Sequence, residues 1–240
     1  MKEAGHDIHG CDLRGGLDCR ETFRVNDVKY DLVVHCADDG LPARRLGTDA
    51  DLFEWVDRIK PTKVVYLSSD AVYPASLQQE PYRLVEDDAA PDTPMGWVYA
   101  ASEQLALDLG CYVFRPFQVY GEGGTGVFHQ VAQMVREEKA LFRVPGCGRV
   151  MDFIHVDDAV ATMVAALETT PTGPVNLCSG DPIAVDDLAL AMMNVVGWKP
   201  QQFVCDASDA TFFRCGSTTL MDEVRPTAIS LVEGIRRYFQ

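Results

Sequence analysis

Short apolar runs alternate along the chain with segments whose apolar residues recur at helical spacing. Residues 31–37 and 63–69 are rich in Val, Leu and Tyr, which is typical of strands buried on both faces of a parallel sheet. Between them, residues 49–59 place apolar side chains three and four positions apart, which predicts a helix. A strand, a helix and a second strand at this separation form a βαβ unit.

The same alternation continues to the end of the sequence. Residues 7–12 are a weaker strand candidate, residues 78–94 read as a long loop, and the pattern becomes more mixed from about residue 116 onward. We predict further strands over 111–114, closed by Pro116, and 175–177, and further helices over 98–109, 125–138, 156–167, 185–196 and 231–239. The sequence therefore predicts an α/β fold around a parallel sheet.

Charge and composition exclude several classes of protein. The 240 residues contain 21 Lys and Arg against 36 Asp and Glu, a net charge of −15, with no basic run, which argues against nucleic-acid binding. No stretch approaches the ~18 apolar residues of a membrane span, and the first residues lack the apolar region of a secretion signal. We expect a soluble, cytoplasmic protein that does not associate with a membrane.

Cysteine and histidine give no sign of a metal site. The eight cysteines are scattered and form no C-x-x-C pair, which predicts reduced, mostly buried thiols rather than a disulfide framework. His6 and His9 have no companions at metal-ligand spacing, so we expect them on the surface or in packing contacts. Asp157 and Asp158 are expected at a helix N-terminus, where the helix dipole stabilises carboxylates.

Five short motifs carry the candidate chemistry. They are SSDAVY at 68–73, YAASE at 99–103, RPFQVYG at 115–121, DFIHVDD at 152–158 and NLCSG at 176–180. In this order and spacing they resemble the extended short-chain dehydrogenase/reductase family, which includes NAD-dependent nucleotide-sugar epimerases, dehydratases and reductases. The resemblance runs over roughly residues 4–240. It implies a Rossmann-like, doubly wound parallel sheet with NAD or NADP as the cofactor and a nucleotide-sugar as the small-molecule partner.

The resemblance also implies a division of the chain and an assembly. Residues 1–115 would form the nucleotide-binding part, and residues 116–240 a mixed part with a small substrate-binding lobe, the elements of the two interleaving. The family usually dimerises through helices that correspond to 49–59 and 98–109 here, so we expect a homodimer or pairing with another chain.

Individual residues receive roles from the same resemblance. Ser69 and Tyr99 match the Ser/Thr and the Tyr with which the family moves a proton on a sugar hydroxyl. Asp70 stands where the dehydratases have an acid, although their next residue, Glu, is Ala71 here. The residues expected to contact the cofactor are Asp12, Asp18, His35 and Ala37, and those expected to contact the substrate are Arg115, Gln118 and Arg149. For Arg149, a solvated surface position is an equal alternative.

The sequence departs from the family pattern at its start. The family opens with a strand and a Gly-rich turn that binds the pyrophosphate of the cofactor at a helix N-terminus. Here residues 1–5 resemble the last turn of that helix, and neither the strand nor the turn is in the sequence. Either the sheet closes up, another chain fills the place, or the sequence is a piece of a longer protein.

Two further departures concern the acid–base and substrate positions. Glu103 stands where the family has Lys, four residues after Tyr99, and this reversal of charge is expected to raise the pKa of Tyr99. Met151 and Gln118 stand where the family usually has an Arg and an Asn.

Two hypotheses about function follow, and they belong to different classes of protein. One is a divergent epimerase/dehydratase that uses Ser69 and Tyr99 on a nucleotide-sugar without standard NAD redox chemistry, and the other is an inactive relative that binds nucleotide or sugar, or regulates a partner.

Overall fold

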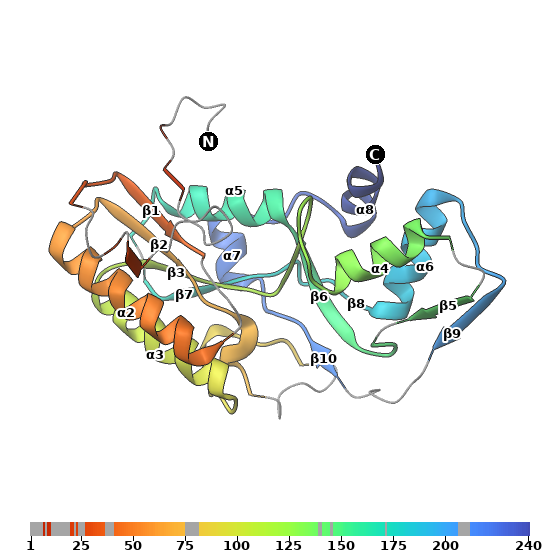
Figure 1. Ribbon diagram of the computed structural model, residues 1–240, viewed down its shortest axis with the longest axis horizontal. Helices are drawn as coiled ribbons and strands as arrows, with labels where there is room; N and C mark the ends of the chain where they lie inside the picture. Colours follow the sequence, from red (N-terminus) through yellow and green to blue (C-terminus); the bar gives the residue numbers. More distant parts are fainter. Residues whose placement is uncertain are drawn as a thin grey trace.

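The computed structural model is an α/β fold in which most strand pairs are parallel (Figure 1). The structure describes residues 7, 9–10, 20–21, 23, 27–36, 41–74, 82–138, 141–144, 146–170, 172–205 and 212–240. Half of the weak strand predicted over 7–12 lies outside these residues, and the described half, at positions 7, 9 and 10, is not in a strand. The predicted α/β class is confirmed.

The first sheet contains the strands that the sequence predicts best. Its four strands are parallel in the order β1 (Leu32–His35), β2 (Lys63–Leu67), β3 (Tyr112–Pro116) and β7 (Pro174–Leu177). The register places Val33 opposite Val64 and Val65 opposite Tyr112. Within the described residues, β1 forms one edge of this sheet.

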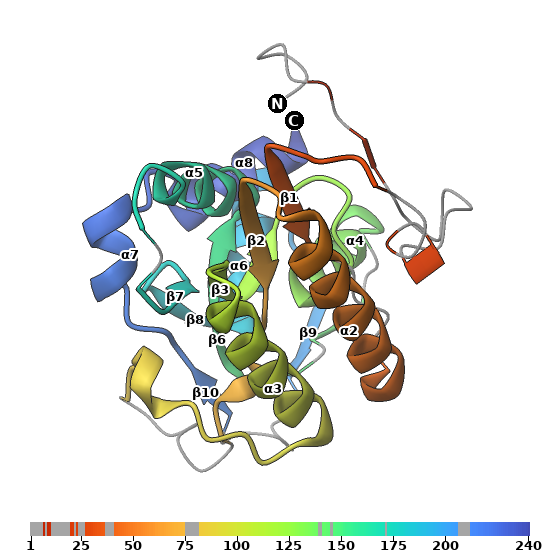
Figure 2. The same cartoon turned by 90° about the vertical axis from the view of Figure 1, so that its left-hand side faces the viewer.

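Helices cover both faces of this sheet (Figure 2). They are α2 (Pro42–Ile59) and α3 (Pro94–Asp108) on one face, and α5 (Val156–Ala166) and α7 (Thr219–Val224) on the other. Successive side chains of a strand point to opposite faces of the sheet. Val64 and Tyr66 therefore pack with Trp55 of α2, whereas Val65 packs with Met221 of α7. The inner strands β2 and β3 therefore have the double burial that continuous apolar runs predict. For the edge strand β1 the prediction is wrong, because Val34 is 43% exposed.

Two helices begin earlier than their apolar pattern predicts. Helix α2 starts at Pro42 rather than at residue 49, since proline is pre-organised for a first helical turn. Its early turns bury the charged side chains of Arg45 and Asp49, which interrupt the apolar spacing. Helix α3 likewise starts at Pro94, where the Thr93 side chain accepts a hydrogen bond from the backbone N–H of Gly96.

The remaining strands and helices form a second layered region. Its larger sheet has the strand order β10 (Phe213–Arg214), β6 (Val150–His155) and β4 (Gln118–Tyr120), and β8 (Pro182–Ala184) is antiparallel to β6. A separate two-stranded sheet pairs β5 (Leu141–Val144) with β9 (Gln202–Cys205). Helices α4 (Val127–Arg136), α6 (Val185–Val196) and α8 (Leu231–Phe239) confirm the three predictions for this region and share one core with β6. None of these helices, nor any other among the described residues, has the length and apolar character needed to cross a membrane.

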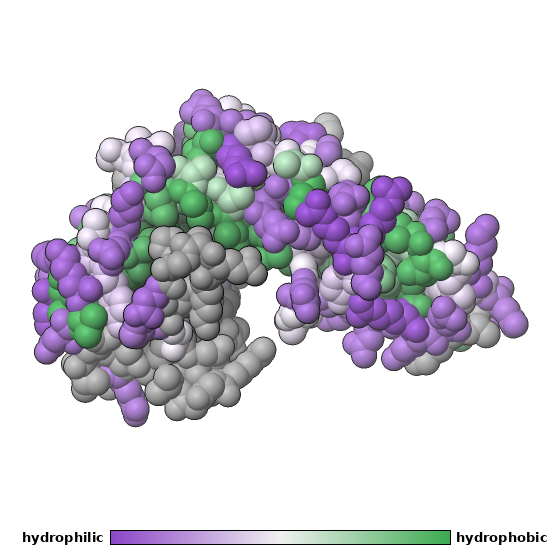
Figure 3. Space-filling model, turned by 90° about the horizontal axis from the view of Figure 1, so that it is seen from above, coloured by the Kyte–Doolittle hydropathy of each residue, from purple (hydrophilic) through white to green (hydrophobic). Residues whose placement is uncertain are grey.

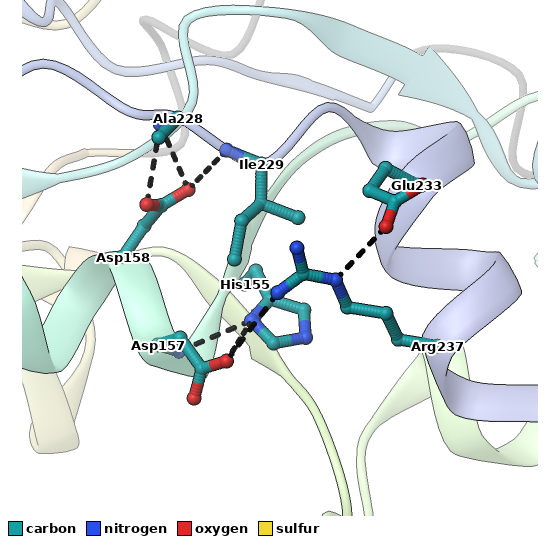
Figure 4. Close-up of polar contacts among 7 residues, drawn as sticks. All are labelled: His155, Asp157, Asp158, Ala228, Ile229, Glu233 and Arg237. Carbon is teal, nitrogen blue, oxygen red and sulfur yellow. Dashed lines mark hydrogen bonds and ion pairs between the residues drawn. The ribbon is translucent and has the colours of Figure 1, made fainter.

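Carboxylates at the start of α5 anchor the C-terminal segment (Figure 4). Asp158 is buried and accepts hydrogen bonds from the backbone N–H groups of Ala228 and Ile229, the latter at 2.8 Å. Asp157 lies 3.7 Å from Arg237 of α8, which also donates to Glu233 at 3.0 Å. Both aspartates occupy the first helical turn, as predicted.

One pair of cysteines corrects the expectation of reduced thiols. Cys147, after β5, is joined by a disulfide to Cys205 at the end of β9, 58 positions further along the sequence. Such a separation carries no spacing signal, so the sequence could not identify the pair. The other described cysteines, at positions 36, 111, 178 and 215, are thiols that form no disulfide. Among the described residues, the one cluster of candidate metal ligands is this disulfide pair together with Asp186.

Candidate functional site

The turn of Ser69 packs directly against the helix that carries Tyr99. Ser69 follows β2, and its Oγ accepts a hydrogen bond from the backbone N–H of Ala71 and donates to Asp70 at 3.3 Å. This turn, the short 3-10 helix η3 (Asp70–Val72), touches the first turn of α3, because a Cβ on Gly96 would lie 2.3 Å from the carbonyl oxygen of Ala71. Tyr99 is 4% exposed and belongs to the same apolar cluster as Val72 and Tyr73. The two expected acid–base residues thus come from elements in contact at the carboxyl edge of the sheet.

Glu103 and Arg115 form a bidentate ion pair. Arg115 Nε donates to Oε1 of Glu103 at 2.9 Å and Nη2 donates to Oε2 at 2.7 Å, and both side chains are buried. Arg115 Nη1 also donates to the hydroxyl of Tyr73 at 3.1 Å and to the carbonyl of Glu86 at 2.7 Å. Burial alone would lower the pKa of Arg115, but the hydrogen bonds and charge of Glu103 outweigh it and raise the pKa. The guanidinium expected to contact substrate is therefore held by the protein, and the carboxylate at the family's Lys position has its own counter-ion.

A second buried ionic network lies beside Tyr99, and sequence reasoning did not identify it. Asp49 of α2 is hydrogen-bonded by Arg45 Nε at 3.0 Å, by His35 Nε2 at 2.9 Å and by the Tyr66 hydroxyl at 2.7 Å. Burial would raise the pKa of Asp49, but the hydrogen bond from His35 and the charge of Arg45 together lower it. The available signal was the R-x-x-x-D spacing, which aligns Arg45 and Asp49 on one helix face.

Arg45 also contacts the ring of Tyr99. Its Cζ atom lies 4.9 Å from the centre of that ring and 5.1 Å from the ring of Tyr66. The guanidinium is fixed by Asp49 and by a hydrogen bond from Nη2 to the carbonyl of Leu67 at 2.9 Å. A buried cation therefore lies against the expected acid–base residue.

Arg214 of β10 secures Asp70 from the other side. Its Nη1 donates to the carbonyl of Asp70 at 2.8 Å and lies 3.3 Å from the Asp70 carboxylate. Its Nε is buried without a hydrogen-bond partner among the described residues. Arg149 approaches the same strand, because Arg149 and Arg214 both lie over the ring of Phe212, at 4.4 and 5.6 Å. Sequence reasoning missed Arg214 because a strand of two residues leaves no periodic pattern.

Two of the predicted motifs meet at Asp152. Its Oδ1 accepts hydrogen bonds from the backbone N–H and hydroxyl of Ser179, at 2.7 and 2.6 Å, and its Oδ2 accepts one from the N–H of Gly180 at 3.0 Å. Burial raises the pKa of Asp152 in spite of these hydrogen bonds. Asp152 thus holds the segment after β7 against β6, which is a structural role.

Of the four residues expected to contact a dinucleotide, the structure describes one. Asp12, Asp18 and Ala37 lie outside the described residues. His35, the remaining expected cofactor contact, is buried and directs its Nε2 to Asp49, while Glu103 is bound to Arg115. Gln118 is partly buried in β4, and a Cβ on Gly126, before α4, would lie 3.9 Å from its Oε1. The molecular surface is hollowed between the part that holds the β1-β2-β3-β7 sheet and the part that holds α4 and α6 (Figure 3).

Comparison with known proteins agrees with this architecture. A model of the NAD dependent epimerase/dehydratase family matches residues 1–178. The chain is 24% identical over 225 residues to a dTDP-4-dehydro-6-deoxy-D-allose reductase of a Streptomyces species, with 82% of this chain and 68% of that protein covered.

Solved structures share the fold at low sequence identity. RMD from Pseudomonas aeruginosa, complexed with NADPH, has a TM-score of 0.79 at 19% identity, covering 96% of this chain and 86% of that one. The UDP-glucose 4-epimerase of Thermotoga maritima, with UDP-glucose, has a TM-score of 0.74 at 20% identity, covering 92% of this chain and 79% of that one. These similarities confirm the Rossmann-like fold that the sequence predicts.

Proposed function

The chain belongs to the NAD-dependent epimerase/dehydratase family, and from this premise we propose that it binds a nucleotide-sugar and moves a proton on the sugar with Tyr99, oriented by Ser69. The observation that supports this most is the contact between Gly96 and Ala71. It fixes the Ser69 turn against the helix of Tyr99, and acid–base chemistry requires both hydroxyls at one place on the substrate.

In this proposal the two hydroxyls have separate tasks. The Tyr99 hydroxyl gives a proton to, or takes one from, a sugar oxygen, while the Ser69 hydroxyl hydrogen-bonds that oxygen and orients it. Tyr99 is buried, so its environment excludes water and strengthens electrostatic effects on the proton transfer. Asp70, which is held by Arg214, is a second acid at the same turn.

Arg149 and Arg214 are our candidates for the diphosphate of the nucleotide-sugar. Both guanidinium groups lie over Phe212, and the Nε of Arg214 has no hydrogen-bond partner among the described residues. Arginine matches phosphate oxygens with its planar set of donors. We assign Gln118 to the sugar, and we do not assign Arg115 to the substrate because its guanidinium is engaged with Glu103 and Tyr73.

NAD(P) is the cofactor that family membership implies, and the two solved structures above contain NADPH in one case and UDP-glucose in the other. When bound to such enzymes the nicotinamide accepts or supplies a hydride. Since His35 and Glu103 are committed to other side chains here, we derive no step that passes through the dinucleotide.

A second candidate function is favoured by the same two ion pairs. If the Glu103–Arg115 pair and the His35–Asp49 contact replace cofactor contacts, the chain would be an inactive relative that binds a nucleotide or sugar and regulates a partner. The two functions differ in turnover and agree in ligand binding.

Calorimetry with NAD+, NADP+ and a panel of nucleotide-sugars, followed by product analysis, tests both. We expect binding of a nucleotide-sugar and turnover that is lost in Tyr99→Phe while ligand binding is kept. Binding without turnover, with or without added NAD(P), would favour the regulatory function. Turnover that survives in Tyr99→Phe would contradict the proposed role of Tyr99, and absence of any nucleotide-sugar binding would contradict both functions.

We also propose that the chain divides into a nucleotide-binding part, residues 1–115, and a mixed part with the substrate-binding lobe, residues 116–240, whose elements interleave, since β7 completes the first sheet.

We further propose that the chain forms a homodimer through α2 and α3. Trp97, Ala101 and Leu105 recur every four residues along α3 and are exposed, Trp97 to 62%. An exposed apolar stripe of this kind is typical of a helix that packs against another chain. Sedimentation equilibrium of the wild type and of Leu105→Lys tests the dimer. We expect the wild type to be dimeric and the charge introduced by Leu105→Lys to raise the dissociation constant of the dimer.

A further inference from the structure

The cation against Tyr99 comes from α2 rather than from the helix of Tyr99 itself. On α3 the position one turn after Tyr99 holds Glu103, and both oxygens of its carboxylate accept hydrogen bonds from Arg115. Arg45 of α2 lies instead with its Cζ 4.9 Å from the centre of the Tyr99 ring. We propose that Arg45 stabilises the phenolate of Tyr99 and is thereby a positioning residue for the proton transfer. This inference rests on the proposed function, in which Tyr99 exchanges a proton.

Burial gives this contact its strength. Arg45 and Tyr99 are 2% and 4% exposed, so little water screens the interaction between the guanidinium and a charge on the ring. The position of Arg45 is determined by bonds that do not involve Tyr99, namely those to Asp49 and to the carbonyl of Leu67. A cation that is held in place before the phenolate forms needs no rearrangement when it does form.

The effect on the two partners is mutual. Burial alone would lower the pKa of Arg45, but the pKa is raised, chiefly by Tyr66 and Asp49 and to a smaller extent by Tyr99. The same interaction free energy acts on both residues. If an ionised Tyr99 stabilises the charged form of Arg45, then the charged Arg45 stabilises the ionised form of Tyr99 by the same amount.

In the part of the chain that the structure describes, the carboxylates of the elements packed around Tyr99, namely Asp49, Glu103 and Asp70, are each paired. Asp49 accepts hydrogen bonds from Arg45, His35 and Tyr66, so we expect it to weaken the effect of Arg45 without reversing it. Glu103 is paired with Arg115, which also holds the Tyr73 hydroxyl, and Asp70 is paired with Arg214. From the segment after β7, the thiol of Cys178 packs in the Tyr99 cluster, and burial raises its pKa well above the ordinary value, so it is neutral.

The ionisation of Tyr99 can be measured without substrate. The chain would be labelled with ¹³C at Cζ of its eight tyrosines, and the Tyr99 signal identified by its loss in Tyr99→Phe. The signal is then followed against pH in the wild type and in three variants. Arg45→Gln combined with Asp49→Asn removes the pair without leaving a lone buried charge, Arg45→Lys keeps the cation, and Arg58→Gln is the matched control, an exposed arginine of the same helix.

We expect the double variant to raise the pKa of Tyr99 by about one unit or more, a tenfold change in proton affinity. Arg45→Lys should restore most of the wild-type pKa, and Arg58→Gln should leave it unchanged. A folded double variant in which Tyr99 has the wild-type pKa would overturn the proposal.

If the double variant does not fold, the titration of the wild type alone tests the proposal. Tyr99 should then titrate below Tyr66 and Tyr73, whose pKa values burial raises. A Tyr99 that titrates with or above those two also overturns it. If Tyr99 titrates as expected but Tyr99→Phe retains turnover, the charge relationship stands and the proposed function fails.

Discussion

The Nη2 atom of Arg115 lies 2.7 Å from Oε2 of Glu103, and in this buried ion pair each residue has a counter-charge that the sequence alone does not reveal. From spacing, Glu103 is a lone carboxylate one turn from Tyr99, and Arg115 is a cation available to substrate. In the structure each neutralises the other, and Arg115 extends the contact to Tyr73 and to the backbone at Glu86. The pair therefore ties α3 to β3 and to the loop before α3.

Removing one member of this pair should destabilise the fold. Glu103→Gln leaves the buried guanidinium of Arg115 without a counter-charge, and we expect a loss of roughly 3–5 kcal/mol in the free energy of unfolding. The double variant Glu103→Leu, Arg115→Met should lose clearly less, because no lone charge remains. Urea unfolding of the two variants measures this, with Glu54→Gln as an exposed control expected within about 0.5 kcal/mol of the wild type. Equal losses in the single and the double variant would contradict the argument.

The close approach of α3 to the Ser69 turn makes glycine necessary at position 96. A Cβ there would lie 2.3 Å from the Ala71 carbonyl oxygen, which is backbone, so Gly96→Ala must displace the turn. We expect a loss of roughly 1–3 kcal/mol in the free energy of unfolding and a larger loss of turnover. Gly47→Ala on α2 is the matched control, since no atom lies within 4 Å of the added Cβ. It should stabilise the chain by about 0.5–1 kcal/mol. Two glycine variants with the same sign would contradict this account.

The first sheet and most helices could be predicted because their burial follows a simple period. Continuous apolar runs gave β1, β2 and β3, and helical spacing gave α6 and α8 with the bounds that the structure has. The small strands β4, β5, β8, β9 and β10 were missed because such short segments, most of them broken by a polar or charged side chain, form no continuous apolar run. Strand β6 was missed because it buries Asp152 among its apolar residues.

The candidate site was predicted less completely, for a different physical reason. Ser69 and Tyr99 are predicted from local motifs, whose residues lie close together in the sequence, and their roles stay a prediction. The partners of charged residues cannot be found in this way, since Arg115 meets Glu103, and Arg214 meets Asp70, only through the fold. Charge pairing across elements therefore decides which of the predicted binding residues are available to a ligand.

Acid should weaken the fold through Asp49. Its pKa is lower in the folded chain than in the unfolded one, where it is about 3.9. Protons then bind the unfolded state more tightly, so the stabilisation is complete above that value and is lost as the pH falls through the folded pKa. Asp49→Asn should be less stable than the wild type by roughly 3 kcal/mol at pH 7, and the difference should shrink below about pH 4.

Urea unfolding between pH 3 and 7 measures this contribution of Asp49. The matched control is Asp57→Asn on the same helix, because the Asp57 carboxylate is exposed and its ion pair with Lys60 lies in solvent. Such a surface pair contributes about 1 kcal/mol or less, so the control should stay close to the wild type across the pH range. A stability difference between Asp49→Asn and the wild type that does not change with pH would contradict the role of the Asp49 charge.

The Cys147–Cys205 disulfide should stabilise the second region of the fold. It closes a separation of 58 positions, and the chain-entropy model gives such a bridge about 4 kcal/mol, with measured values of roughly 2–4. We therefore expect a thiol reductant to lower the unfolding midpoint of the wild type, together with a mass increase of about two hydrogens that confirms cleavage of one bridge. Cys205→Ser should have the lower midpoint already and should not respond to reductant, whereas Cys36→Ser, which changes an exposed thiol outside the bridge, should behave as the wild type. A wild-type chain whose unfolding is the same with and without reductant would show that this bridge does not contribute to stability.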